Sequence, residues 1–227
     1  MVEFELVLAN STRVKANQES NPELFWALKG GGNNFGIVTR ITIDTFRSPP
    51  RWCTFQLFSM EDLADVFDRL EMNTALMPPH VWQITTTFGW HVPTQRFVIS
   101  ERMVVSELPD LPEGISRLGQ HDTWKESPVL QTNVYERSVL DMAQKMDGMN
   151  KKGFFNFFGS LTVRSNAQVS IALARIFQQE VDLIRDTAGL QVYIVYNPLT
   201  LNAMRQMMKR GGNALGLSEE HGPLTGT

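Results

Sequence analysis

Residues 21 to 39, with the sequence NPELFWALKGGGNNFGIVT, constrain the fold more than any other part of the chain. Asn21 is a favourable N-cap and Pro22 a favourable first helical residue, so the run predicts a short helix. Gly30 is expected to end that helix in a left-handed conformation. The helix has one apolar face, which consists of Leu24, Phe25 and Leu28.

A strand is predicted directly after the glycines. Apolar and polar side chains alternate there, at Phe35, Ile37, Thr39, Ile41 and Ile43. A phosphate-binding loop needs the order strand, glycines, helix N-terminus. Here the glycines follow a helix and precede a strand, which excludes a P-loop and a Rossmann fingerprint. Local chemistry favours a tight helix-to-strand turn. The alternative is that Gly31, Gly32 and Gly36 leave bare backbone for close approach to something flat.

The run from Val2 to Phe46 resembles the end of the flavin-binding domain of berberine-bridge-enzyme-like oxidases. These enzymes belong to the vanillyl-alcohol oxidase/p-cresol methylhydroxylase (PCMH) superfamily of FAD-linked oxidoreductases. The similarity rests on the Ala-Asn turn at Asn10, the helix NPELFWALKGGG and the strand entry NFGIVT. A second stretch, NPLTLNAMRQMMKRGGNALGLSEEHGPL, resembles the late substrate domain of the same family. The resemblance covers nearly the whole chain, strongly at both ends and weakly in the middle.

The resemblance implies an FAD cofactor, and it implies that part of this cofactor contacts Gly31, Gly32, Asn34, Gly36, Ile37 and Val38. In this family the pyrophosphate loop and the His and Cys that bond to the flavin lie upstream of the region matched here. Cys53 does not match that cysteine. Tight or covalent FAD binding by this chain is therefore not expected. The implied organisation is a remnant of a PCMH-type FAD-binding domain at 1–47 and a substrate domain at 48–227, incomplete at its C-terminus.

Composition narrows the remaining function classes. The chain has 227 residues, 42% hydrophobic and 20% charged, as in folded globular proteins. A net charge of −3 gives no reason to expect a nucleic-acid partner.

No run is apolar enough to span a membrane, and Glu3 and Glu5 follow Met1 where a signal peptide would be basic and then apolar. We expect a cytoplasmic chain as it stands, although family members are often secreted. The single cysteine excludes an internal disulfide, and no histidine has a partner at metal-ligand spacing.

Beyond the boundary marked by Pro49 and Pro50, the pattern predicts an α+β domain, an antiparallel sheet covered by helices. Ser59 and Asp62 form a capping signal before a helix, whose apolar residues at helical spacing are Leu63, Val66, Phe67 and Leu70. Strands are predicted at 81–90, 97–106, 154–163 and 190–196. Helices are predicted at 134–146, 166–187 and 201–210, and loop with short helix at 107–130. In the first domain, apolar residues alternate with Glu3 and Glu5, namely Val2, Phe4, Leu6 and Leu8. This alternation predicts a strand with one solvent-exposed face.

Aromatic side chains concentrate on the predicted strands, at Trp82, Phe88, Trp90, Phe154, Phe155, Phe157 and Phe158. They indicate either ordinary sheet core or a flat apolar wall for an aromatic or polyketide-like substrate. Polar candidates for the same wall are Gln83, Thr85, Thr87 and Asn156. Tyr193 and Tyr196 lie on opposite faces of one strand, so one of them could meet a ligand. Buried core with a satisfied hydroxyl is the more common role of such a tyrosine.

Two functional classes follow. The first is an FAD-linked oxidase of a small secondary metabolite, as the resemblance implies, with the catalytic base unknown. The second is a flavin-free lyase, isomerase, cyclase or binding protein that reuses the substrate pocket. An inactive truncated product is a third reading. Uncovered sheet edges, including the apolar face of Val2, Phe4, Leu6 and Leu8, predict self-association or pairing with a complementary flavin-binding segment.

Overall fold

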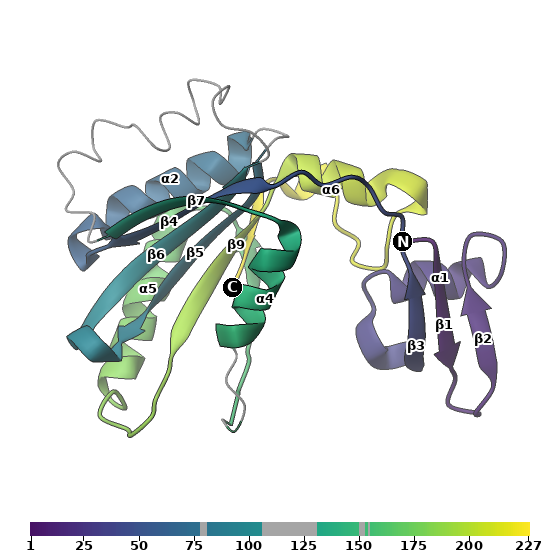
Figure 1. Cartoon of the computed structure of the whole chain (residues 1–227), viewed down its shortest axis with the longest axis horizontal. Helices are drawn as coiled ribbons and strands as arrows, with labels where there is room; N and C mark the ends of the chain where they lie inside the picture. The colour runs from purple at the N-terminus through teal and green to yellow at the C-terminus, as the bar shows by residue number, and fades with distance from the viewer. Residues whose placement is uncertain (78–80, 106–130, 150–152, 154) are drawn as a thin grey trace. The chain divides into compact units, whose positions relative to one another are not determined.

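A computed structural model of the chain describes residues 1–77, 81–105, 131–149, 153 and 155–227 (Figure 1). The residue contacts divide it into two compact units. The first unit comprises Met1–Arg47 and Leu201–His221, and the second comprises Ser48–Thr200 and Gly222–Thr227. No helix among these residues is long and apolar enough to cross a membrane.

The first unit contains a three-stranded antiparallel sheet under one helix. Its strands, in the order β2-β1-β3, are β1 (Glu3–Val7), β2 (Arg13–Ala16) and β3 (Ile37–Thr42). Helix α1 (Pro22–Leu28) buries Phe25 and Leu28 against Phe4, Leu6 and Ala16. The opposite face is charged: Lys15 Nζ lies 3.3 Å from Glu3 and 3.5 Å from Glu5. The predicted strand with one solvent-exposed face is confirmed. Helix α1 covers Phe4 and Leu6, which we expected to lie uncovered.

Two local predictions for this unit are wrong and one is confirmed. Asn21 has left-handed backbone angles, φ 52° and ψ 54°, and its side chain does not cap α1. Its Nδ2 donates instead to Lys15 O over 2.8 Å, which ties the helix entry to β2. The helix ends at Leu28 with Lys29 as C-cap, and Gly30 follows with a positive φ of 140°, as predicted. Phe35 belongs to a 3-10 turn, Gly32–Phe35, that precedes β3. The alternating pattern thus located the strand but not its start.

One α-helix and two 3-10 turns follow β9 along the chain and belong to the first unit. They are α6 (Leu201–Met208) and the turns at Lys209–Gly211 and Glu219–His221. Arg205 and Glu219 form an ion pair that ties the last turn to α6. Met204 is the fully buried residue of α6.

The second unit is built on a seven-stranded sheet in which every neighbouring pair is antiparallel, in the order β7-β4-β6-β5-β9-β10-β8. The strands are β4 (Arg51–Phe58), β5 (Val81–His91), β6 (Arg96–Val105), β7 (Gln131–Arg137), β8 (Thr162–Arg164), β9 (Tyr193–Leu199) and β10 (Leu224–Gly226). This is the α+β, antiparallel class that the sequence predicted.

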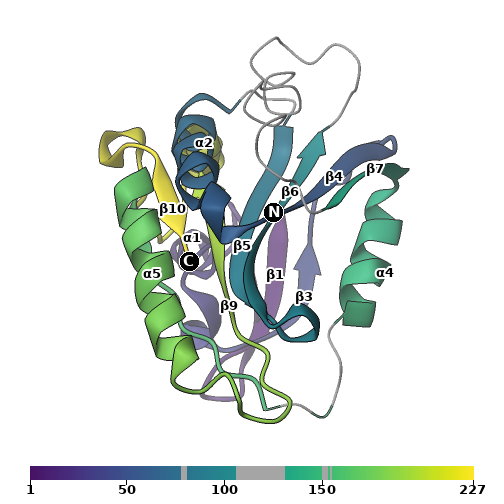
Figure 2. The same cartoon turned by 90° about the vertical axis from the view of Figure 1, so that its left-hand side faces the viewer.

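Helices α2 (Leu63–Leu76) and α5 (Ala167–Asp182) lie on one side of this sheet, and α4 (Val139–Met149) lies on the other (Figure 2). The main core forms under α2 and α5. All four residues predicted for the buried face of α2 are in it, namely Leu63, Val66, Phe67 and Leu70. The Ser59–Asp62 cap is also confirmed, because Asp62 Oδ2 accepts the Ser59 N–H over 3.0 Å. Asn166 caps α5 by accepting the Val169 N–H over 3.0 Å.

Two predicted elements differ. The helix expected at 134–146 is a strand up to Arg137 and a helix from Val139. The break falls at Ser138, whose Oγ accepts the Asp141 N–H over 3.0 Å in a capping pair that was overlooked. The strand expected at 154–163 is reduced to β8, because pairing with β10 reaches back only to Leu161. Phe154 and residues 107–130 lie outside the described residues.

Thr86 gives a direct test of which side of β5 is buried. Its side chain is fully buried under the helices, and its Oγ1 has no hydrogen-bond partner among the described residues. Replacing a buried unpaired hydroxyl by a methyl removes a desolvation cost, so Thr86→Val is expected to raise the free energy of unfolding by about 1 kcal/mol. Thr87→Val, on the other side of the strand, should change it by less than about 0.5 kcal/mol. Urea unfolding measures both, and equal effects would contradict the assignment of faces.

Candidate functional site

The side of the seven-stranded sheet opposite α2 and α5 is the candidate site. Along β5, Ile84, Thr86 and Phe88 are buried towards the helices, so the alternating residues point the other way. Gln83, Thr85 and Thr87 are on that side, and Gln83 Nε2 donates to Thr85 Oγ1 over 3.0 Å. We call this side the open face, and define it by Gln83, Thr85, Thr87, Ser100, Arg102 and Tyr193.

The neighbouring strand β6 adds two residues that the sequence analysis missed. Register places Ser100 opposite Thr87 and Arg102 opposite Thr85, both half-buried. Arg102 Nε is buried and has no hydrogen-bond partner among the described residues. The sequence contains a signal for them, because Ser100 and Arg102 alternate with Ile99, Glu101 and Met103 in a predicted strand. Arg102 brings a permanent positive charge to the centre of the open face.

The two tyrosines of β9 separate as expected. Tyr193 lies opposite Gly89 on the open face and is 56% exposed. Tyr196 lies opposite Thr86, is fully buried against Phe67, and donates its hydroxyl to Ser170 O over 3.1 Å. Burial raises the pKa of this phenol. Tyr196 is therefore a core residue with a satisfied hydroxyl, and it is removed from the candidate ligand wall.

Of the two alternatives for the aromatic side chains, ordinary sheet core is the one that Phe88 and Trp90 bear out. Phe88 and Trp90 pack in the core under the helices, each beside Phe97, at centroid distances of 5.4 and 5.1 Å. Trp82 is 42% exposed, and the Arg51 guanidinium lies 3.4 Å from its ring centroid. Asn156 is exposed in a segment without regular structure, together with Phe155, Phe157 and Phe158, so it does not join Gln83 and Thr85 on the sheet.

Cys53 lies beside the open face, under α4. Its Sγ is 3.2 Å from Met142 Sδ, and the residue is 1% exposed. Burial raises the pKa of the thiol, although the positive charges of Arg102, Arg137 and Lys145 oppose this shift. A buried thiol with a raised pKa is a poor nucleophile. The described residues contain no group of three His, Cys, Asp or Glu side chains that could hold a metal ion.

A buried carboxyl lies on β6, on the side of the sheet that α2 and α5 cover. Glu101 lies opposite Gln56 and Thr86 and is 5% exposed. Burial raises its pKa above the ordinary value of 4.5, and the charge of Arg69 opposes this shift. Arg69 is itself largely buried, and desolvation lowers the pKa of its guanidinium.

This arrangement predicts a pH dependence of stability. A carboxyl whose pKa is raised by folding binds more protons in the folded than in the unfolded state. Its contribution to the free energy of unfolding is therefore greatest below pH 4.5 and is lost as pH rises through the folded pKa. Glu101→Gln, which stays neutral, should show a smaller loss between pH 4.5 and 8 than wild type in urea unfolding. Glu180→Gln, on the exposed end of α5, is the control; a slope unchanged by Glu101→Gln would contradict the assignment.

The glycine segment of the first unit is explained largely by its own packing. A Cβ on Gly31 would lie 2.4 Å from the Phe35 ring and 2.6 Å from Ala27 O. Asn34 Nδ2 donates to Gly31 O over 2.7 Å and closes the turn. Val38 packs against the first unit's core. Among the six residues that the resemblance implied for FAD contact, Gly32, Asn34 and Ile37 are exposed.

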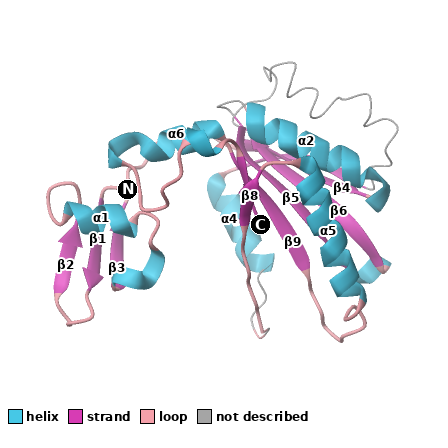
Figure 3. Ribbon diagram, turned by 180° about the vertical axis from the view of Figure 1, so that it is seen from behind, coloured by secondary structure: helices cyan, strands magenta, loops and turns pink. Residues whose placement is uncertain are grey.

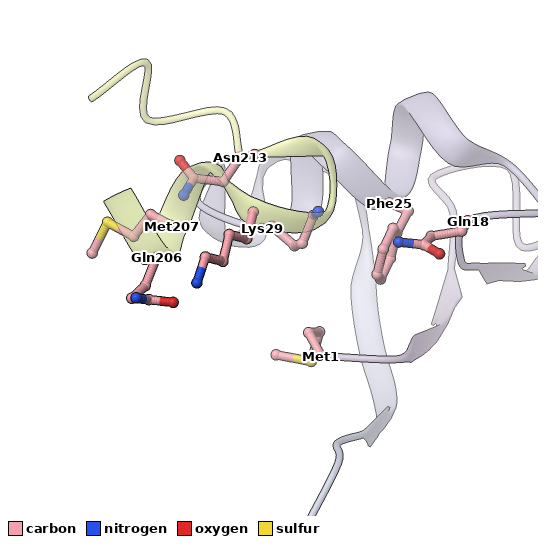
Figure 4. Close-up of a pocket in the computed structure, with 9 residues that line it drawn as sticks. Met1, Gln18, Phe25, Lys29, Gln206, Met207 and Asn213 are labelled. Atoms are coloured by element: carbon pink, nitrogen blue, oxygen red, sulfur yellow. The ribbon is translucent and has the colours of Figure 1, made fainter. Parts of the chain in front are cut away.

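The first unit also has an open cavity of about 500 Å³ (Figure 4). Phe25, Lys29, Gln206 and Met207 line it, and the Lys29 ammonium lies 4.6 Å from the Phe25 ring centroid. None of the residues predicted to bind FAD or substrate lines this cavity. Its lining residues are otherwise Met1, Gln18, Lys209, Gly212 and Asn213.

Curated relatives are similar to this chain over different shares of its length. The "FAD-dependent monooxygenase FUP4" of Fusarium proliferatum is 27% identical over 97% of this chain and 44% of its own length. An "Uncharacterized FAD-linked oxidoreductase" of Arthroderma benhamiae is 54% identical over 53% of this chain and 26% of its own. No family model matches the chain.

Solved structures match in fold. The structure of a variant of Physcomitrella patens BBE-like 1 superposes with a TM-score of 0.68 at 18% identity, over all of this chain and 48% of that one. The chain is similar in sequence to FAD-linked oxidoreductases and in fold to a berberine-bridge-enzyme-like protein. It spans about half the length of FUP4 and of the Physcomitrella patens protein. The resemblance inferred from NPELFWALKGGG and GGNALGL is thereby confirmed.

Proposed function

We propose that this chain supplies the substrate-binding part of an FAD-linked oxidoreductase that acts on a small aromatic or polyketide-type secondary metabolite. In this proposal the first unit contains the end of a PCMH-type FAD-binding domain, and the second unit is the substrate domain. The observation that carries the proposal is the open face, a polar patch on one side of a sheet whose other side is closed by α2 and α5. Relatives named as FAD-dependent support the same assignment.

The open face has the composition of a small-molecule site, in which a few polar groups are placed among apolar ones. Tyr193 offers a phenolic donor from β9, and Gln83 offers an amide from β5. Arg102 offers a charged donor that suits a phenolate or carboxylate oxygen of a substrate. Bound FAD would supply the acceptor for a hydride from the substrate. The residues of the open face would bind and orient that substrate.

The glycine segment can meet only part of the cofactor. Gly32 has open space where a Cβ would be, and Ile37 is 73% exposed, so backbone and one apolar side chain are accessible there. Ile41 and Phe46 are also exposed, at 54% and 70%. We propose that a complementary flavin-binding segment, or a second copy of the chain, covers these residues. The same exposed residues would explain self-association of the isolated chain.

Titration calorimetry of FAD with the isolated chain tests whether the chain holds only part of the FAD-binding site. We expect no submicromolar binding, because only Gly32, Asn34 and Ile37 are exposed for contact. Submicromolar affinity would show that the chain holds most of the cofactor site by itself and would overturn this part of the proposal. A matched titration with Ile37→Asp distinguishes weak binding at this segment from binding elsewhere.

A further inference from the structure

The open face carries positive charge that no carboxylate on the same side of its strands balances. One row of residues runs from Phe55 on β4 through Arg102 on β6 to Thr85 on β5. Among the described residues of β4, β5, β6 and β9, none that alternation places on this side is Asp or Glu. Glu101 is next to Arg102 in the sequence, but it lies on the side that α2 and α5 cover, where Arg69 interacts with it.

Two further cations lie near the same part of the sheet. Burial raises the pKa of the Cys53 thiol, and the positive charges of Arg102, Arg137 and Lys145 all oppose this shift. Lys145 belongs to α4, which lies on the side of the sheet away from α5 (Figure 3). Asp141, at the start of α4, interacts electrostatically with Arg137. An anion bound beside Arg102 would therefore meet a positive potential and no carboxylate on the neighbouring strands.

The row of Arg102 offers two hydrogen-bond donors to a ligand. Arg102 Nε is buried and has no hydrogen-bond partner among the described residues. Thr85 Oγ1 accepts from Gln83 Nε2 over 3.0 Å, which leaves the Thr85 hydroxyl hydrogen to donate. A buried donor without a partner is unfavourable, and a negatively charged oxygen is the acceptor that relieves this cost best.

The spacing of these donors fits a carboxylate better than a single oxygen. Arg102 and Thr85 lie directly opposite each other in antiparallel strands, where Cβ atoms are about 4.5–5.5 Å apart. A planar guanidinium can bind both oxygens of a carboxylate, whereas a phenolate offers one oxygen. Thr87 and Ser100 form the next row on this side, about 7 Å along the strands. A carboxylate in the Arg102 row therefore allows an aromatic ring to lie over Thr87 and Ser100.

We propose that Arg102 and Thr85 form an anion subsite on the open face, and that the substrate is an aromatic acid bound there as its carboxylate. This inference rests on the proposed function, because it names the substrate class of the same site. The carboxylate anchors one end of the ring, which leaves the opposite end of the substrate for oxidation.

Equilibrium dialysis of the flavin-free chain tests the subsite without any turnover. The probes are para-(hydroxymethyl)benzoate and para-(hydroxymethyl)benzamide, which have nearly the same shape and differ in charge. We expect the benzoate to bind at least about tenfold more tightly, and Arg102→Gln to remove this preference. Arg96→Gln, at the exposed start of β6, is the matched control and should keep the preference. Equal affinity of the wild-type chain for both probes, or binding of neither, would overturn the proposal.

Two milder variants keep the test decisive if Arg102→Gln does not fold. Arg102→Lys retains the charge but loses the planar fork, so the preference for the benzoate should fall at least about threefold. Thr85→Val removes the second donor and should also reduce the preference. Circular dichroism shows whether each variant is folded. A preference unchanged in both folded variants would overturn the assignment of the subsite to this row.

A third probe distinguishes the carboxylate from a phenolate. Para-nitrophenolate has a single charged oxygen, so it should bind at least about threefold less tightly than the benzoate. Tighter binding of the phenolate would overturn the proposed substrate class.

The dialysis needs no flavin, so its outcome is independent of the proposed oxidation. Equal affinities for the benzoate and the benzamide, together with flavin reduction by neutral aromatic alcohols, would remove the subsite alone. A preference for the benzoate in a chain that never supports flavin reduction would support the subsite and remove the proposed function alone.

Discussion

Gly36→Ala is expected to unfold the first unit. Gly36 has φ +146°, a conformation that L side chains rarely adopt, and an added Cβ would lie 2.5 Å from Val7 O in β1. Strain at such a φ costs about 1–3 kcal/mol, and the backbone clash with β1 adds to it. A unit this small has little stability to lose. Exchange rates of the β1 amides, Glu3–Val7, should rise to those of the unfolded chain.

Gly32 provides the matched control for this prediction. It also has a positive φ, +64°, but nothing lies within 4 Å of a Cβ built on it. Asn tolerates this left-handed conformation, so Gly32→Asn should cost less than about 1 kcal/mol. If Gly32→Asn unfolds β1 as completely as Gly36→Ala, the explanation by backbone contact fails. Equal stability of both variants and wild type would exclude the tight turn altogether.

Thr87→Trp is expected to abolish turnover without unfolding the second unit. Thr87 lies on the open face, opposite Ser100 and Val195. An indole there would fill the space proposed for substrate and raise KM or lower kcat/KM at least about a hundredfold, since misplacement of about 1 Å costs that much. The assay uses a chimera that joins the upstream half of the Arthroderma benhamiae relative to this chain, with a panel of aromatic alcohols.

The control for Thr87→Trp places the same side chain on the solvent-exposed surface of α5. Gln179 is exposed on α5, so Gln179→Trp should leave turnover within about twofold of wild type. Circular dichroism of both variants shows whether the sheet is intact. Full turnover in folded Thr87→Trp would place the substrate elsewhere and exclude the open face as the site.

Much of the fold could be predicted because local signals and tertiary packing agree. The Ser59–Asp62 cap and the spacing of Leu63, Val66 and Phe67 gave α2, and the alternation in 81–90 gave β5 with its two faces. Prediction failed where contacts with residues distant in the sequence determine the local structure. Phe155 and Phe157 have strand propensity, but none of the described strands pairs with their segment. Asn21 caps helices well in general, yet here its amide bonds to β2.

The candidate site was predictable only in part, for a similar reason. Alternation placed Gln83, Thr85 and Thr87 on one side of β5, and three-residue spacing placed Tyr193 and Tyr196 on opposite sides. Which side the helices cover depends on α2 and α5, and sequence alone did not assign Tyr196 to the core. Arg102 needed the register of β5 with β6, which brings it opposite Thr85.

The visible absorption spectrum of the purified chimera tests the central claim most directly. The account predicts a flavin band that co-purifies with the protein and bleaches anaerobically when an oxidisable aromatic substrate is added. It also predicts that folded Thr87→Trp keeps the band but no longer bleaches, whereas Gln179→Trp bleaches as wild type does. A folded chimera without a flavin band, or one in which Thr87→Trp bleaches at the wild-type rate, would contradict the account.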